Sequence, residues 1–335
     1  MESLKQTVIK ARGIKESSWK TYARYIDEMA FKVTGDGFIN SDFLKEKAKV
    51  EALLDTFGDS KRRVALSVIL VVLSPDKKMA PAKGKDGKVW FPGTTPLYKY
   101  YYKRQKALQQ AYNTKMESQT KSEKQAKNWV EWPDVLKLQR SYMNKIRRDK
   151  YSKKEVLTKQ EMKTLQDYLI ISLYTLIKPR RLDFAGMKVM GVKQYSKLAD
   201  KQEHNVLVIN GKVKKVFKFG ASAQKNENGG QSIYSLPVPA NLNRVLQLYF
   251  KFHKQPFLLF NSRRSGEITK DGLSKQIMAL MNNKFPGKSI GASLLRTIFS
   301  THFNKDGKSI KEKKAAAEEM GHSSGVAEVH YTKKD

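Results

Sequence analysis

The sequence contains no cysteine and only five histidines among its 335 residues. Without cysteine the chain can form neither a disulfide framework nor a thiolate zinc site. The histidines are scattered, no His-Glu-x-x-His segment occurs, and carboxylates do not cluster, so the sequence predicts no metal site. A glycine-rich phosphate loop is also missing, and we therefore expect no cofactor.

Long apolar runs are missing as well. The longest, residues 68–73, is far shorter than the roughly 20 residues that a helix needs to cross a bilayer. The N-terminal residues lack the apolar region of a signal peptide. Together with the lack of cysteine, which fits a reducing compartment, these features predict an intracellular protein that is not embedded in a membrane.

Acidic residues are few, because 32 Asp and Glu stand against 65 Lys and Arg, for a net charge of +33. Such a surplus predicts a polyanionic partner, with nucleic acid as the first candidate and an acidic membrane surface as the second. The length predicts two or three domains, and a hydrophobic content of 40% is enough to build their cores.

Residues 13–75 have the pattern of a compact helical bundle. In the first helix, apolar residues recur at the three- and four-residue spacing of one helix face. A second helix begins near Asp42, and the third, residues 61–73, is almost wholly apolar after Arg63 and should form the buried centre. The residues of the first apolar face are Trp19, Tyr22, Ile26, Met29 and Val33.

Residues 76–95 combine lysines and glycines without apolar periodicity, which predicts a basic linker. A long helix, residues 98–127, should follow, and four tyrosines near its start are interleaved with cations. Lys99, Lys103 and Arg104 are candidate DNA contacts, since alternating Tyr and Lys or Arg suits a sugar-phosphate backbone. An amphipathic helix with its tyrosines turned inward fits the same pattern.

Residues 128–335 mix helical and β patterns. Thr158 and Glu161 form a capping-box pair at the start of a helix that Pro179 ends, so that Arg180 should begin the next helix. Residues 204–238 predict three antiparallel strands, the first two joined at an Asn210-Gly211 turn. We therefore expect a mainly α fold with a small antiparallel β-sheet, divided into residues 1–75, 76–127 and 128–335.

The last sixteen residues hold the strongest chemical signal. Residues 308–320 should be helical, Gly321 should end that helix, and Ser323 or Ser324 can cap a short helix that runs to Tyr331. His322 would then lie at the corner between the two helices. A Tyr hydroxyl and a His at an enclosed corner suit phosphoryl transfer, with Tyr as nucleophile and His as proton handler. A terminal helix with one packed Tyr and one surface His is the alternative.

Met320-Gly321-His322-Ser323-Ser324, followed by a tyrosine nine residues after the histidine, resembles the C-terminal signature of the tyrosine recombinases, the phage-integrase family. The segment Pro179-Arg180-Arg181-Leu182-Asp183 is similar to divergent members from crypton-type mobile elements and large DNA viruses. The resemblance implies an N-terminal helical core-binding domain that clamps DNA and a mixed α/β catalytic domain.

The resemblance also implies a role for each site residue. Tyr331 would be the nucleophile, Arg180 and Arg296 would bind the scissile phosphate, and His322 would handle the Tyr proton or bind phosphate. Asp183 would buttress Arg180. Arg181 competes with Arg180 for its role and is otherwise a candidate DNA contact.

Two positions depart from the family pattern or leave a choice. Ser293 stands where the family box His-x-x-Arg has histidine, and it can hydrogen-bond a phosphate oxygen but cannot act as a base near neutral pH. The family's general-acid lysine lies on the turn between its second and third strands. Lys225 is at that turn, and Lys218, near the end of the second strand, is the alternative and a further candidate DNA contact.

The expected function is that of a site-specific recombinase or integrase acting on double-stranded DNA through a 3′-phosphotyrosyl intermediate. It would lie in the nucleus or viral replication site of a eukaryotic host, or otherwise in the cytoplasm. We expect a tetramer on paired DNA sites and a monomer in free solution, because the four residues after Tyr331 are too few for an exchanged helix. A type IB topoisomerase-like enzyme and a non-catalytic basic DNA-binding protein are the alternatives.

Overall fold

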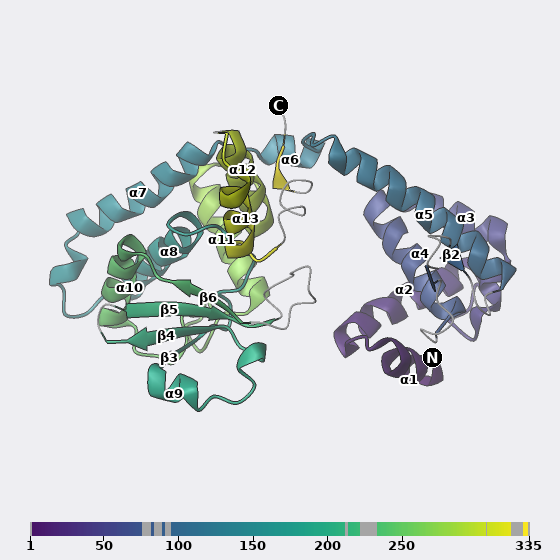
Figure 1. Ribbon diagram of the computed structural model, residues 1–335, viewed down its shortest axis with the longest axis horizontal. Coiled ribbons are helices and arrows are strands. Elements are labelled where there is room, and N and C mark those ends of the chain that lie inside the picture. The colour runs from purple at the N-terminus through teal and green to yellow at the C-terminus, as the bar shows by residue number, and fades with distance from the viewer. Residues whose placement is uncertain are drawn as a thin grey trace. The chain divides into compact units, whose positions relative to one another are not determined.

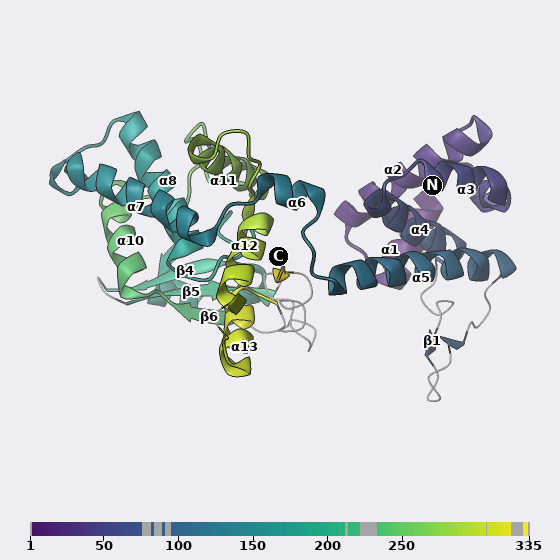
Figure 2. The ribbon, with the colours of Figure 1, turned by 90° about the horizontal axis from the view of Figure 1, so that it is seen from above.

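The structure is a computed structural model of the 335-residue chain. It describes residues 2–75, 82–83, 89–90, 95–211, 214–221, 233–305, 307–322 and 331–333. The chain divides into two compact units, Met1–Lys115 and Met116–Asp335. Each is described by itself, and Figures 1 and 2 show the elements of both from two directions.

The first unit is helical. Its core combines the predicted apolar face of the helix over residues 16–34 with the apolar fourth helix, as the spacing of these residues indicates. Tyr98 and Tyr101 complete this core, so the inward-facing interpretation is confirmed for these two tyrosines. The elements are α1 (Glu2–Arg12), α2 (Glu16–Thr34), a 3-10 helix (Ser41–Lys45), α3 (Lys47–Asp55), α4 (Asp59–Leu73), β1 (Ala82–Lys83), β2 (Val89–Trp90) and α5 (Pro96–Glu117).

Two predicted helices are each divided in the structure. The helix expected after Asp42 consists of the 3-10 helix and α3, because Glu46 between them has a non-helical backbone with φ −73° and ψ 58°. The helix expected over residues 98–127 ends as α5 at Glu117, and α6 (Glu123–Asn128) begins afresh. Ser122 caps α6 in a reciprocal capping box with Gln125, a local stop-and-start that apolar periodicity does not reveal.

The second unit is built around α8 (Lys159–Thr175), in which nearly every residue from Met162 onward is buried. The predicted capping box is confirmed, since the Thr158 hydroxyl accepts from the Glu161 N–H and the Glu161 carboxylate accepts from the Thr158 N–H. Helices α7 (Trp132–Arg148), α10 (Ala240–Phe252) and α11 (Lys270–Lys284) pack against α8. The remaining helices are α9 (Val192–Ser196), α12 (Ala292–Lys305), α13 (Ile310–Glu319) and two 3-10 turns (Tyr151–Lys153 and Lys201–Glu203).

The sheet of this unit has four strands in the order β3-β4-β5-β6. They are β3 (Lys188–Gly191), β4 (Val206–Asn210), β5 (Lys214–Phe219) and β6 (Tyr234–Pro237), and Figure 1 shows them side by side. The mainly α fold with a small sheet is confirmed, and Asn210 pairs with Lys214 at the predicted hairpin. The three strands predicted over residues 204–238 are confirmed as the antiparallel strands β4, β5 and β6. An unpredicted fourth strand, β3, pairs with β4 in parallel, so the sheet is mixed. The chain returns between these strands through α9, a crossover that parallel pairing requires.

The segment after α8 also differs from the prediction, because Arg180 does not begin a helix. Residues 178–187 form an irregular loop with a turn at 183–186. The Asp183 carboxylate is bonded to Arg180, and Gly186, with φ +61°, donates its N–H to the carbonyl of Ile268. The local Arg180–Asp183 bond and the tertiary bond from Gly186 to Ile268 hold this segment as a loop that leads into β3.

Candidate active site

Arg180 lies in this loop and is fully buried. Its Nε donates to Asp183 Oδ2 at 2.9 Å, and its Nη1 donates to the backbone carbonyl of Glu319. The guanidinium also lies 3.8 Å from the ring centroid of Phe219 on β5. Burial lowers the pKa of Arg180, and the charge of Asp183 opposes that shift. Contacts with Asp183, Glu319 and Phe219 thus hold the buried guanidinium of Arg180 in place.

Arg296 lies on α12 and is also fully buried. Its Nη2 donates to the carbonyl of Met320 at 3.2 Å, and burial lowers its pKa to about 10. Among the residues that the structure describes, its Nε and Nη1 have no hydrogen-bond partner. A buried guanidinium with two unused nitrogens is costly unless an anion accepts from it.

Tyr331 and His322 lie beside Arg296. The ring of Tyr331 stacks on the imidazole of His322, with centroids 4.9 Å apart and planes 4° from parallel. The Cζ of Arg296 is 4.5 Å from the centroid of the Tyr331 ring. His322 is buried, whereas Tyr331 is partly exposed.

The backbone around Tyr331 is anchored to α12. Thr301 Oγ1 donates to the carbonyl of Tyr331 at 3.5 Å and accepts from the N–H of Lys333 at 3.0 Å. Asn304 Nδ2 donates to Thr332 Oγ1 at 2.6 Å. Sequence reasoning missed Thr301 and Asn304, whose only local signal is that they follow Arg296 on the same helix.

Arg181 is the third arginine at this place. It is half-buried, and its Nη1 donates to the carbonyl of Gly321 at 3.3 Å. The structure therefore brings together Arg180, Arg181, Arg296, His322 and Tyr331, which come from three separate segments of the chain. Arg180 and Arg181 both donate to backbone carbonyls at the end of α13, so both are candidates for binding a phosphate.

The remaining predicted site residues are Ser293, Lys218 and Lys225. Ser293 is exposed in the first turn of α12. Lys218 on β5 donates to Ser235 Oγ at 2.8 Å, and because strand side chains alternate, it points to the opposite face from Phe219, which contacts Arg180. The structure thus does not bring Lys218 to the arginines. Lys225 lies outside the described residues.

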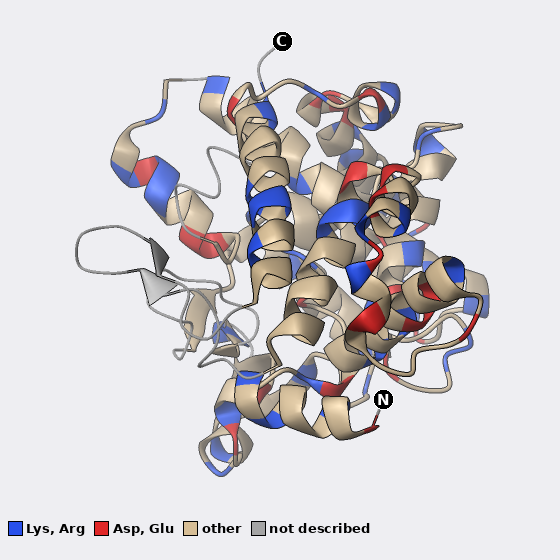
Figure 3. Cartoon of the chain, turned by 90° about the vertical axis from the view of Figure 1, so that its right-hand side faces the viewer, with Lys and Arg blue, Asp and Glu red and all other residues tan. Residues whose placement is uncertain are grey.

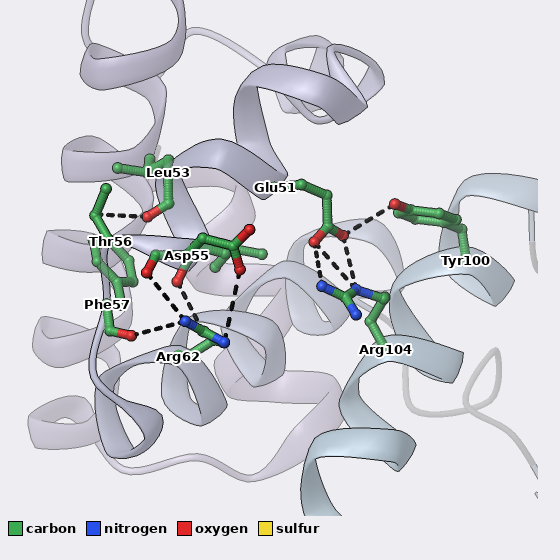
Figure 4. Close-up of polar contacts among 9 residues, drawn as sticks. Glu51, Leu53, Asp55, Thr56, Phe57, Arg62, Tyr100 and Arg104 are labelled. Carbon is green, nitrogen blue, oxygen red and sulfur yellow. Dashed lines mark hydrogen bonds and ion pairs between the residues drawn. The ribbon is translucent and has the colours of Figure 1, made fainter.

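The three candidate DNA contacts of the first unit lie on α5. Lys99, Lys103 and Arg104 are exposed there, but Arg104 is engaged within the unit. Figure 4 shows its guanidinium facing the Glu51 carboxylate, with Nη2 2.7 Å from Oε2, while Tyr100 donates to Oε1 at 3.1 Å. Figure 3 shows Lys and Arg on many other elements of the chain as well, interspersed with Asp and Glu.

The described part of the chain contains neither a membrane-spanning helix nor a cluster of metal ligands. Within those residues, no helix is both long and apolar enough to cross a membrane. Nor do three or more His, Cys, Asp or Glu residues gather there as ligands for a metal ion.

No family model matches the chain, and no curated protein matches it. Among solved structures, 14 chains match it. One of them is the crystal structure of XerA recombinase, which is 12% identical to this chain. The alignment covers 100% of this chain and 94% of that chain, with a TM-score of 0.34. The identity and the TM-score are both too low for this neighbour to indicate a function of the chain.

Proposed function

We propose that this protein breaks and rejoins DNA strands in the manner of a tyrosine recombinase. The observation that carries the proposal is Arg296, a fully buried guanidinium with Nε and Nη1 unpaired among the described residues, beside the ring of Tyr331. A phosphodiester supplies the anionic oxygens that such donors require. The large positive charge of the chain favours DNA as the bearer of that phosphodiester.

In the proposed reaction, Arg180 and Arg296 hold the non-bridging oxygens of one phosphate. Negative charge on these oxygens grows as the phosphorus becomes five-coordinate, and a planar guanidinium offers paired donors to it. Both arginines are held by carbonyl bonds before substrate arrives, so little reorganisation is needed at the moment of reaction.

Tyr331 then attacks the phosphorus through its hydroxyl oxygen. The new bond is a 3′-phosphotyrosyl ester, the bond to the 5′-oxygen breaks, and that oxygen leaves as a hydroxyl after taking a proton, which we assign to Lys225. The phenol proton passes to water, because face-to-face stacking does not aim the hydroxyl at a nitrogen of His322. The ester conserves the energy of the phosphodiester, so a 5′-hydroxyl can reverse the step and rejoin a strand.

A nicked duplex that loses its short 5′-fragment on cleavage traps this ester and tests the proposal. We expect the wild-type chain to form a covalent protein–DNA adduct and Tyr331→Phe to form none while binding DNA as before. Tyr234→Phe is the matched control, since that ring lies 5.8 Å from Arg180 Cζ. An adduct that persists in Tyr331→Phe, or none with the wild type on any of a library of duplexes, contradicts the proposal.

We propose further that strand exchange takes place in a tetramer on paired DNA sites. Tyr331 is anchored to α12 of its own chain, which supports cleavage by each subunit with its own nucleophile. Mixing Tyr331→Phe with Arg296→Ala protein should then leave cleavage unrestored. Restoration would mean that a neighbouring subunit delivers the tyrosine.

A further inference from the structure

The C-terminal end of α13 binds all three arginines through its backbone. A helix ends with carbonyls that have no partner within the helix. At the end of α13, the carbonyls of Ala317 and Glu318 accept hydrogen bonds from the backbone that follows, because Gly321, with φ +79°, reverses the direction of the chain. The N–H of His322 donates to the carbonyl of Ala317 and that of Gly321 donates to the carbonyl of Glu318, which is the Schellman arrangement.

The next three carbonyls each accept from a different guanidinium. Arg180 bonds the carbonyl of Glu319, Arg296 that of Met320 at 3.2 Å, and Arg181 that of Gly321 at 3.3 Å. Three successive backbone oxygens thus hold three cations side by side. The partial negative charge at a helix C-terminus favours cations there, which offsets part of their mutual repulsion.

Glu319 adds a second link between α13 and the arginine loop. Its side-chain Oε1 accepts from the backbone N–H of Lys178 at 2.7 Å, while its own carbonyl accepts from Arg180. Both ends of the segment 178–180 are therefore bound to one residue. The carboxylate also opposes, together with Asp183, the lowering of the Arg180 pKa that burial causes.

We infer that the last turn of α13 is the element that positions the arginines, and that Glu319 is its positioning residue. The catalytic consequence of this inference rests on the proposed function, whereas its structural consequence does not. Because Glu319 acts through Lys178 and Arg180, losing its side chain should move the loop without removing any group that touches DNA phosphate.

The test compares Glu319→Ala, Glu319→Gln and Glu318→Ala. Glu318 is the matched control, because it is exposed on the same helix turn and its loss removes the same charge. The first readout is the hydrogen exchange rate of the Lys178 amide without DNA. We expect it to rise in Glu319→Ala, to stay near the wild-type value in Glu319→Gln, which retains an acceptor oxygen, and to stay unchanged in Glu318→Ala.

The second readout separates the rate of adduct formation from DNA affinity. Glu319→Ala should form the adduct roughly 10- to 100-fold more slowly, as a displaced catalytic group does. Its DNA dissociation constant should stay near the wild-type value, and Glu319→Gln should recover most of the rate.

Three results overturn the inference: unchanged exchange at Lys178 in Glu319→Ala, adduct formation by that variant at the wild-type rate, or an equal loss of rate in Glu318→Ala. Wild-type protein that forms no adduct contradicts the proposed function alone, and the exchange measurement then still decides whether Glu319 holds the loop.

Discussion

The ring of Tyr331 lies flat against the ring of His322, with the centroids 4.9 Å apart and the planes 4° from parallel. A hydrogen bond to an imidazole nitrogen lies close to the plane of the ring, so this arrangement presents the imidazole face to the tyrosine. The sequence suggested His322 as a proton handler. The stacked geometry favours a different contribution, in which the buried, flat ring of His322 orients Tyr331, the proposed nucleophile.

Replacing His322 by Phe or by Ala separates these two roles. If stacking is what matters, His322→Phe should keep adduct formation within about tenfold of the wild type, whereas His322→Ala should lose more, since the ring contact is lost. Single-turnover rates on the nicked substrate measure both. Equal inactivity of the two variants would restore the proton-handling interpretation.

Arg296 should make the DNA-free protein less stable than an apolar residue would. Burial holds its pKa at about 10, well below the ordinary value of a guanidinium. We expect Arg296→Met to form no adduct but to raise the free energy of unfolding by roughly 1–3 kcal/mol, as when a buried charge is replaced by an apolar side chain. Urea unfolding measures the difference, and a less stable Arg296→Met would mean that its carbonyl bond outweighs its desolvation.

The difference in unfolding free energy between the wild type and Arg296→Met should depend on pH, and the lowered pKa of Arg296 gives its sign. Above about pH 10, the unfolded wild type keeps the Arg296 proton that the native state loses. The unfolded state then binds more protons, so wild-type stability rises with pH relative to the variant. The higher unfolding free energy of Arg296→Met should be constant at lower pH and should approach that of the wild type above pH 10. Unfolding both proteins at each pH measures this difference, because the effects of the other titrating groups then cancel.

The hydrogen bonds of Thr301 and Asn304 should determine the fraction of molecules in which Tyr331 is positioned beside Arg296. Thr301→Val removes two hydrogen bonds to residues 331–333 and Asn304→Ala removes one. We expect adduct formation to slow by roughly tenfold in each variant, with DNA affinity unchanged. His302→Ala, on the same helix, controls for general effects on α12. Wild-type rates in both variants would show that DNA, and not α12, orders this segment.

Lys103 and Arg104 are neighbours on α5 with different expected effects. Lys103→Ala should weaken DNA binding and lower the salt dependence by about one counterion, if Lys103 contacts a phosphate. Arg104→Ala should change the salt dependence less, because the fork of Arg104 already binds Glu51. It should instead destabilise the first unit by about 0.5–1 kcal/mol, as a partly exposed ion pair does. Equal salt slopes for the two variants would mean that Arg104 leaves Glu51 for DNA.

Local pattern was sufficient for much of this chain. The capping box at Thr158, the end of α13 at Gly321 and the hairpin at Asn210 were all predictable, because each depends on residues a few positions apart. The breaks at Glu46 and Ser122 were not predicted. Apolar residues continue on both sides of Glu46, where only the backbone departs from the helix. Residues 117–125 contain no apolar residue, so periodicity could not show where one helix ends there and the next begins.

The sequence by itself determined which residues are able to do the chemistry: a tyrosine nine positions after a histidine, and arginines on two distant segments. Only the tertiary structure decided how they meet. Arg180 and Arg181 reach the end of α13 from about 140 positions away, and Arg296 from 24. These bonds, like the parallel pairing of β3 with β4, form between segments whose approach depends on how the whole core packs. The spacing of residues within one segment therefore does not predict which distant segments come together.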